Sequence, residues 1–466
     1  MAATSQRATV RVAGADTAAR SAMIASLIFL LVAGLLTWLA AVKLAYPAFV
    51  DEIAFFSYGR LAPMAQAATV FGFFTFANFG AIYYLLPRLT GARLAMEALA
   101  IVGLVASAAI TLVGILSIGF GWTDGRVLAE MHWSVDAALG LTYLIPLGVA
   151  LATVRNRTET SMYVSLWYIL AGVIWLPGLM LAGNIPGNTG TGAALQGAFY
   201  SSGIIGLWSI GVGIGAIYYV IPKITGKPLF SRPLAIAGFW SLAFVQLWTG
   251  GASLVAGPST DWIESIGIVF NLGMIVPALA VLGNYLGTLD GAWDKLRTSS
   301  ALQFGIAAAV ATVFLAVVSS GQSFRSVNAV LGLTVFASGT RYALLFGAGF
   351  FYAASFLSHA IPRSFGRELF SESQGRLALR VALVGVGLTS ILTWLSGLVA
   401  GYGSLAGAYT GETLNVGKTF GAAAGSANYG LIALTSFIAL AGQVLFALNC
   451  YRTITSGVAS SQEVVA

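Results

Sequence analysis

Long apolar runs separated by short polar segments dominate the pattern of the chain. A helix needs roughly 20 apolar residues to cross a lipid bilayer, and the runs reach that length. They predict twelve membrane spans at about 22–44, 60–86, 95–120, 132–154, 161–183, 193–221, 233–256, 263–288, 301–320, 327–361, 377–401 and 425–450. The pattern therefore predicts an all-α, polytopic membrane helix bundle of about twelve transmembrane helices.

Polar residues outside these runs form tails and short connections, with no room for a second folded domain. The first 20 residues are polar and basic, and they lack the apolar core and cleavage site of a removable signal peptide. We expect a cytoplasmic N-terminal tail at 1–21, a twelve-helix membrane domain at 22–452 and a cytoplasmic C-terminal tail at 453–466.

Lysine and arginine are distributed unevenly between the two sides of such a bundle. One set of alternate connections holds only Lys43, Arg60, Arg126, Arg325 and Lys418. All the other basic residues except Arg341 lie in the tails and the opposite connections. Because positive residues favour the cytoplasmic side, both termini are expected in the cytoplasm.

Composition supports a membrane protein and narrows its chemistry. The chain is 58% hydrophobic and 8% charged, whereas soluble domains carry about 25% charged residues. The net charge of +7 is explained by loop anchors, so we expect no nucleic-acid partner. The single cysteine, Cys450, excludes an internal disulfide and a cysteine-based metal site, and we interpret it as a small apolar residue.

A similar sequence pattern, an internal repeat, recurs in three of the expected spans. The strings "GFFTFANFGAIYYLLPR" and "GLWSIGVGIGAIYYVIPK" share a glycine-rich stretch, a Tyr-Tyr pair, and then proline and a basic residue. A third run ends "SFLSHAIPR", with Ser358 and His359 in place of the tyrosines. Small residues let membrane helices approach closely, so this internal repeat predicts a pseudo-symmetric bundle around central cavities.

Several strings carry a family resemblance over about residues 58–366. They are "YYVIPKITGKPLFSRPLAIAGFW", "GAWDKLRT" and "IPRSFG", with "GRVLAEMHW" (Glu130, Trp133, then Asp136) and "MYVSLWY" (Trp167). Together they resemble the catalytic subunit I of C-family (cbb-type) haem-copper cytochrome c oxidases. The resemblance implies a twelve-helix core in the bacterial inner (cytoplasmic) membrane. It also implies two haems and one copper held by six histidines, for oxygen reduction with electrons from c-type cytochromes.

This sequence departs from that family at every ligand. The six histidine positions fall on Ala65, Ser202, Ala252, Ser253, Thr340 and Tyr342, and the redox-tyrosine position falls on Gln246. The only histidines, His132 and His359, lie elsewhere and are interpreted as structural residues. Haem iron needs His, Met, Cys or Tyr as a protein ligand, and copper needs imidazole or thiolate. We therefore expect a divergent paralogue with no catalytic residues, haem, copper or other metal.

Two residues keep alternatives open at these positions. Met64 and Tyr342 are permitted haem-ligand types, although bundle packing is the preferred explanation for both. Aromatic residues of "FGFFTF" at 71–76, with Phe346, Phe350, Phe351 and Tyr352, are expected to fill the former cofactor space.

Arg341 is costly inside a membrane span and therefore marks a site or a buried partner. We expect hydrogen bonds to backbone carbonyls, Tyr342, Gln246 or a lipid phosphate. The alternative is contact with an anionic ligand in a former haem cavity.

Two function classes follow from the sequence. The first is a non-catalytic scaffold or accessory subunit of a respiratory or electron-transfer complex, with membrane lipid and other membrane or c-type cytochrome subunits as partners. The alternative is a transporter or a small-ligand or anion-binding protein that reuses the former haem cavities. No inverted repeat of broken helices supports transport. An active terminal oxidase or nitric oxide reductase is disfavoured because the ligand set is missing.

Overall fold

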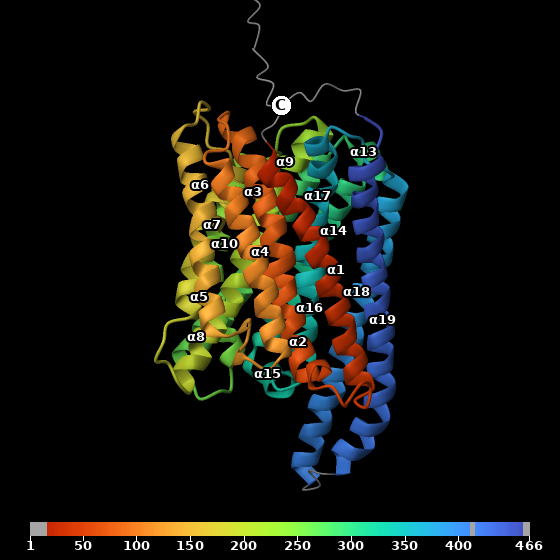
Figure 1. Cartoon of the computed structure of the whole chain (residues 1–466). Helices are drawn as coiled ribbons and strands as arrows, with labels where there is room; N and C mark the ends of the chain where they lie inside the picture. Colours follow the sequence, from red (N-terminus) through yellow and green to blue (C-terminus); the bar gives the residue numbers. More distant parts are fainter. Residues whose placement is uncertain (1–15, 411–414, 460–466) are drawn as a thin grey trace, which may run out of the picture.

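Long helices running side by side form almost all of the described chain, residues 16–410 and 415–459 of a computed structural model (Figure 1). The helices are α1 (Thr17–Ala45), α2 (Tyr58–Ala67), α3 (Thr75–Thr90), α4 (Glu97–Gly119), α5 (Trp133–Thr142), α6 (Leu144–Arg155), α7 (Val164–Gly183), α8 (Thr191–Gly203), α9 (Val212–Thr225), α10 (Arg232–Gln246), α11 (Asp261–Gly273), α12 (Ile275–Leu289), α13 (Trp293–Thr298), α14 (Ser300–Ser323), α15 (Arg325–Leu331), α16 (Phe336–Tyr342), α17 (Phe350–Phe365), α18 (Glu372–Thr410) and α19 (Asn415–Ser456). Short 3-10 helices lie at η1 (Ala54–Phe56) and η4 (Thr249–Leu254), and π-helices at η2 (Ala68–Phe74), η3 (Ile204–Gly211) and η5 (Ala343–Gly349).

Among the described residues, 11 helices are long and apolar enough to cross a membrane, which confirms a polytopic helical bundle. The expected span at 233–256 is the exception. There α10 has 15 residues, so it is about 22 Å long and shorter than a bilayer core. The chain continues as η4, whose Gly250 and Gly251 pack against neighbouring backbone. The seventh span is therefore a short helix followed by a 3-10 segment.

Three spans form the centre of the bundle, and they are the three that share the internal sequence repeat. These spans are α2–η2–α3, α8–η3–α9 and α16–η5–α17. Their most apolar 18 residues are 100%, 89% and 94% buried, against 33–50% for the other candidate spans. Each contains a π-helical segment, and each ends at a left-handed glycine, with φ of 68°, 70° and 62° at Gly91, Gly226 and Gly366. The repeated sequence therefore produces a repeated structure.

The three central spans pack directly on one another. Asn78 donates to the Trp208 carbonyl at 2.8 Å, and the Trp208 indole donates to Thr75 Oγ1 at 3.2 Å. The rings of Phe73 and Phe350 lie 5.9 Å apart. The aromatic residues predicted as fillers are all buried within this core, as expected: Phe71, Phe73, Phe74, Phe76, Phe346, Phe350, Phe351 and Tyr352.

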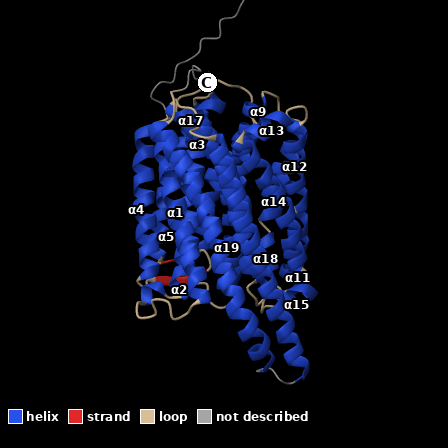
Figure 2. Ribbon diagram, turned by 90° about the vertical axis from the view of Figure 1, so that its right-hand side faces the viewer, coloured by secondary structure: helices blue, strands red, loops and turns tan. Residues whose placement is uncertain are grey.

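Two features differ from the expected pattern. Figures 1 and 2 show α18 and α19 extending beyond the rest of the bundle at one end. The sequence predicted a connection over 402–424, but α18 continues to Thr410 and α19 begins at Asn415. No proline interrupts this stretch, and its alanines favour helix. A small antiparallel hairpin of β1 (Thr123–Arg126) and β2 (Ala129–Met131) was also not predicted.

Both ends of the described chain lie at the same end of the bundle (Figure 1). Ala18 near the start of α1 donates to Glu97, while Arg367 forms a backbone bridge to Ala459. Helix α1 begins within the expected 1–21 tail, and α19 ends within the expected 453–466 tail. The remainder of those tails, 1–15 and 460–466, lies outside the described residues.

Close packing of η4 on α11 gives a first prediction. A Cβ at Gly267 would lie 2.2 Å from the Ala252 nitrogen and 2.4 Å from the Gly251 carbonyl carbon. Backbone atoms cannot rotate away, so Gly267→Ala should lower stability by about 3 kcal/mol. The matched change Gly178→Ala in α7 meets nothing within 4 Å and should leave stability unchanged or slightly raised. Melting temperatures in one detergent compare the two variants, and equal values would contradict this packing.

Candidate functional site in a polar cavity

A cavity of about 390 Å³ lies between two of the central spans, α8–η3–α9 and α16–η5–α17, and the segments α10, η4, α11, α12 and α14. Six positions singled out from the sequence line it: Ser202, Gln246, Ala252, Ser253, Thr340 and Arg341. These residues come from three separate stretches of the chain. The fold therefore brings most of the candidate positions to one place.

Three other candidate residues lie outside this cavity. Met64 and Ala65 are buried in α2, with exposed fractions of 2% and 5%. The Tyr342 ring packs 5.0 Å from the ring of Phe346. None of the three lines the cavity. All three contribute to packing of the central spans.

One wall of the cavity is a hydrogen-bonded polar cluster around Gln246. The Gln246 amide nitrogen donates to Ser202 Oγ at 2.8 Å and to Thr249 Oγ1 at 2.9 Å. Its third contact is the Ser202 carbonyl at 3.1 Å. These contacts fix the orientation of the amide. The sequence analysis missed Thr249, although its spacing of three residues from Gln246 is that of neighbours on one helix face.

The opposite wall combines further polar groups with aliphatic side chains. Thr340 donates to Gln322 Oε1 at 3.1 Å and accepts from the Trp394 indole at 3.1 Å. Asn271 donates to the Ser319 carbonyl at 3.0 Å. The aliphatic part of the lining consists of Ile205, Ile210, Ile214, Leu242, Leu315 and Leu344. The cavity therefore has both polar and apolar surfaces.

Arg341 supplies the cationic group of the cavity lining. It is partly buried and donates no hydrogen bond to any residue that the structure describes. Within the described residues, the expected bonds from Arg341 to carbonyls, Tyr342 or Gln246 are not formed. The charged group that acts on Arg341 is Glu130 on β2, which is only 9% exposed. The sequence analysis named Glu130 as part of the family resemblance but did not link it to Arg341, because it lies in a hairpin between spans.

Burial raises the pKa of Glu130 to about 7. The backbone N–H groups of Leu128 and Glu130 and the Arg341 guanidinium oppose this shift by favouring the carboxylate. The buried Glu130 carboxyl therefore keeps its proton to a higher pH than an exposed glutamate does.

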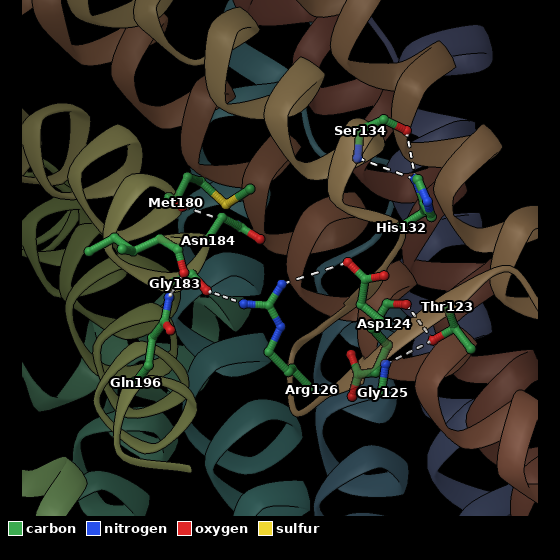
Figure 3. Close-up of polar contacts among 12 residues, drawn as sticks. Thr123, Asp124, Gly125, Arg126, His132, Ser134, Met180, Gly183, Asn184 and Gln196 are labelled. Atoms are coloured by element: carbon green, nitrogen blue, oxygen red, sulfur yellow. Dashed lines mark hydrogen bonds and ion pairs between the residues drawn. The ribbon is translucent and has the colours of Figure 1, made fainter. Parts of the chain in front are cut away.

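The hairpin that carries Glu130 is attached to the bundle by Arg126 (Figure 3). Arg126 donates to the Gly183 carbonyl at the end of α7 at 3.0 Å and forms an ion pair with Asp124 at 3.6 Å. His132 follows β2 and accepts from the Ser134 N–H at 3.4 Å as the N-cap of α5. These contacts hold β2 in place, and they confirm a structural role for His132.

Two buried groups elsewhere have unpaired polar atoms. Both carboxylate oxygens of Asp136 lack a hydrogen-bond partner within the described chain, and the side chain is 1% exposed. Both ring nitrogens of His359 are likewise unpaired in this part of the protein. Cys450 is buried at 1% exposure, in agreement with its interpretation as a packing residue.

The donor set of the cavity does not fit a haem iron or a copper ion. Its polar side chains present hydroxyls, amides and one guanidinium, which carries a positive charge and no lone pair for a metal, and its single sulfur group is the Met274 thioether. Within the described ranges, no group of three or more His, Cys, Asp or Glu residues is placed to hold a metal. No reaction step can be assigned to a metal at these side chains.

Comparison with known proteins gives the family. The family model described as "Cytochrome C and Quinol oxidase polypeptide I" matches residues 17–424. The chain belongs to this family. The comparison confirms the resemblance inferred from the sequence, and the protein is a multi-pass membrane homologue of haem-copper oxidase subunit I.

Two relatives and one solved structure are similar to this chain over most of its length. It is 28% identical over 451 residues to a "Cytochrome c oxidase subunit 1 homolog" from Azorhizobium caulinodans, covering 91% of this chain and 79% of the relative. It is 26% identical over 372 residues to the "Cbb3-type cytochrome c oxidase subunit CcoN1" of Stutzerimonas stutzeri, covering 78% of each. A chain from a cryo-EM structure of a heme-copper terminal oxidase dimer matches with a TM-score of 0.75 at 14% identity. That match covers 96% of this chain and 86% of the other, and it shows the shared fold.

Proposed function

We propose that this protein is a haem-free and copper-free homologue of oxidase subunit I that acts as a non-catalytic scaffold or accessory subunit. Its complex would be a respiratory or electron-transfer assembly in the bacterial inner membrane, with both termini cytoplasmic. The carrying observation is the cavity, lined by Arg341 and by Ser202, Ala252, Ser253 and Thr340, which stand at positions where the family resemblance implies metal ligands. Such a lining disfavours a bound metal cation, while the surrounding bundle is retained.

The shared fold supports a role that depends on the surface of the bundle. The fold matches that of a heme-copper terminal oxidase chain, and the resemblance string "GAWDKLRT" lies at α13, although the ligand residues that the resemblance implies are absent. The Stutzerimonas relative is by name a subunit, so this chain has a precedent for assembly. Partners of this class would be other membrane subunits or c-type cytochromes.

Purification of the full chain from native membranes tests this proposal. We expect less than about 0.1 haem or copper per chain, no Soret absorption from this subunit, and defined membrane or cytochrome subunits that copurify. The CcoN1 relative, purified in parallel, is the positive control for the haem and metal assays.

Stoichiometric haem held by this chain alone would contradict the proposal. In that case Met64→Leu and Tyr342→Phe would be compared, because these residues offer the permitted ligand types. Purification of the chain without any partner subunit would contradict the scaffold role separately.

A second candidate function is small-ligand or anion binding. The specific observation in its favour is an arginine that lines a cavity and donates no hydrogen bond to a described residue. This function is compatible with a subunit role, since the cavity is internal to the chain.

A further inference from the structure

Arg341 is the most unusual group in the cavity because its charge is only weakly compensated by the protein. A buried guanidinium normally forms several hydrogen bonds, since removing it from water is expensive. Here no described residue accepts one, and Glu130 acts on it without forming an ion pair in the described chain. An acceptor from outside the chain would compensate this charge.

The remaining lining defines the chemical class of that acceptor. Gln246, Ser202 and Thr249 satisfy one another, so they are not free to compensate a second charge. The aliphatic residues Ile205, Ile214 and Leu315 face the same space. A volume of about 390 Å³ lies within the range of small-molecule sites. The cavity thus combines one cationic group with a substantial apolar surface.

We propose that this cavity binds a small anionic amphiphile, whose monoanionic head accepts hydrogen bonds from Arg341 and whose apolar body packs against the aliphatic wall. A guanidinium binds a carboxylate or phosphate through two parallel hydrogen bonds, which suits this geometry. The inference rests on the proposed function, because it requires that haem and copper do not occupy these positions.

Calorimetric titration of the purified full chain with octanoate tests the site. Octanoate should bind the wild-type chain, and Arg341→Gln should weaken binding by more than about tenfold, because a charge-assisted bond is lost. Arg325→Gln removes a half-exposed charge outside the cavity and should bind like wild type. Octan-1-ol, which lacks the negative charge, should bind weakly and equally to wild type and Arg341→Gln.

A second variant covers the case in which Arg341→Gln fails to fold. Ala337 lines the cavity four residues before Arg341, so Ala337→Leu should reduce the space beside the guanidinium and weaken octanoate binding while the charge remains. Octanoate affinity unchanged in a folded Arg341→Gln or Ala337→Leu protein would overturn the proposal. Octan-1-ol binding as tight as octanoate would also overturn it.

A further measurement identifies the source of the ligand. Competition by dihexanoyl-phosphatidylglycerol that requires Arg341 assigns the site to a lipid headgroup, whereas octanoate binding without such competition assigns it to a free carboxylate. A haem-free chain that does not bind octanoate defeats this inference alone, whereas a haem-loaded chain defeats the proposed function.

Discussion

Replacement of Trp208 by alanine is expected to lower the stability of the bundle by about 3–5 kcal/mol. Trp208 lies in η3 of a central span and is 0% exposed. Its ring packs 5.7 Å from the ring of Phe79, and its indole donates to Thr75. Truncation removes this packing and also leaves the Thr75 hydroxyl without its donor. The melting temperature of the purified protein, with the monodisperse fraction after solubilisation, measures the loss.

Trp240→Ala is the matched control for this variant. Trp240 lies in α10 and is 60% exposed at the outer surface of the bundle. Its removal should change stability by less than about 1 kcal/mol in a detergent that covers the apolar surface. Similar losses for the two variants would mean that η3 does not lie at the packed centre.

The repeated strings show how much of the bundle centre the sequence predicts. Tyr83, Tyr84, Pro87 and Arg88 recur in the second central span as Tyr218, Tyr219, Pro222 and Lys223. Repeated small and aromatic residues indicate equivalent packing surfaces, and the structure confirms three equivalent central spans. The π-helical segments could not be inferred, because they change the hydrogen-bond register of the backbone and leave the apolar pattern intact.

The seventh span shows the limit of apolar run length as a signal. Residues 249–254, "TGGASL", remain apolar and small enough to continue a membrane helix by composition. The helix nevertheless ends at Gln246, because Gly250 and Gly251 allow the chain to pack closely on Phe199 and Gly267. This close approach depends on tertiary contacts with helices that lie elsewhere in the sequence.

The family resemblance allowed some residues of the candidate site to be predicted from the sequence. Pairs of residues that only the fold brings together were missed. Ser202, Gln246 and Thr340 were identified from their places in the family pattern, and they line the cavity. Glu130 and Arg341 are far apart in sequence, so their electrostatic contact depends on how the hairpin folds over the bundle. Short-range patterns carry no information about such an approach.

Restoring histidines at three cavity positions should convert the cavity into a copper site. The variant combines Ser202→His, Ala252→His and Ser253→His, whose positions line one cavity and are those to which the family resemblance assigns copper ligands. Three imidazoles suit copper, so we expect the copper content to rise from near zero to about one ion per chain. Arg341→Leu added to this variant should increase copper affinity further, since it removes a nearby positive charge. Metal analysis after dialysis and the copper electron paramagnetic resonance spectrum measure both effects.

The single variant Ser253→His is the control, because one imidazole cannot hold copper through dialysis at a site without other ligands. A folded triple variant that retains no more copper than this control would show that the three positions do not converge on one ion. Copper retention that requires all three histidines would instead show that the coordination geometry of the fold survives and that the side chains alone prevent metal binding. That result would distinguish the two parts of the proposal, the retained fold and the absent metal ligands. The fold would be intact, and substitution of the ligands alone would account for the loss of metal binding.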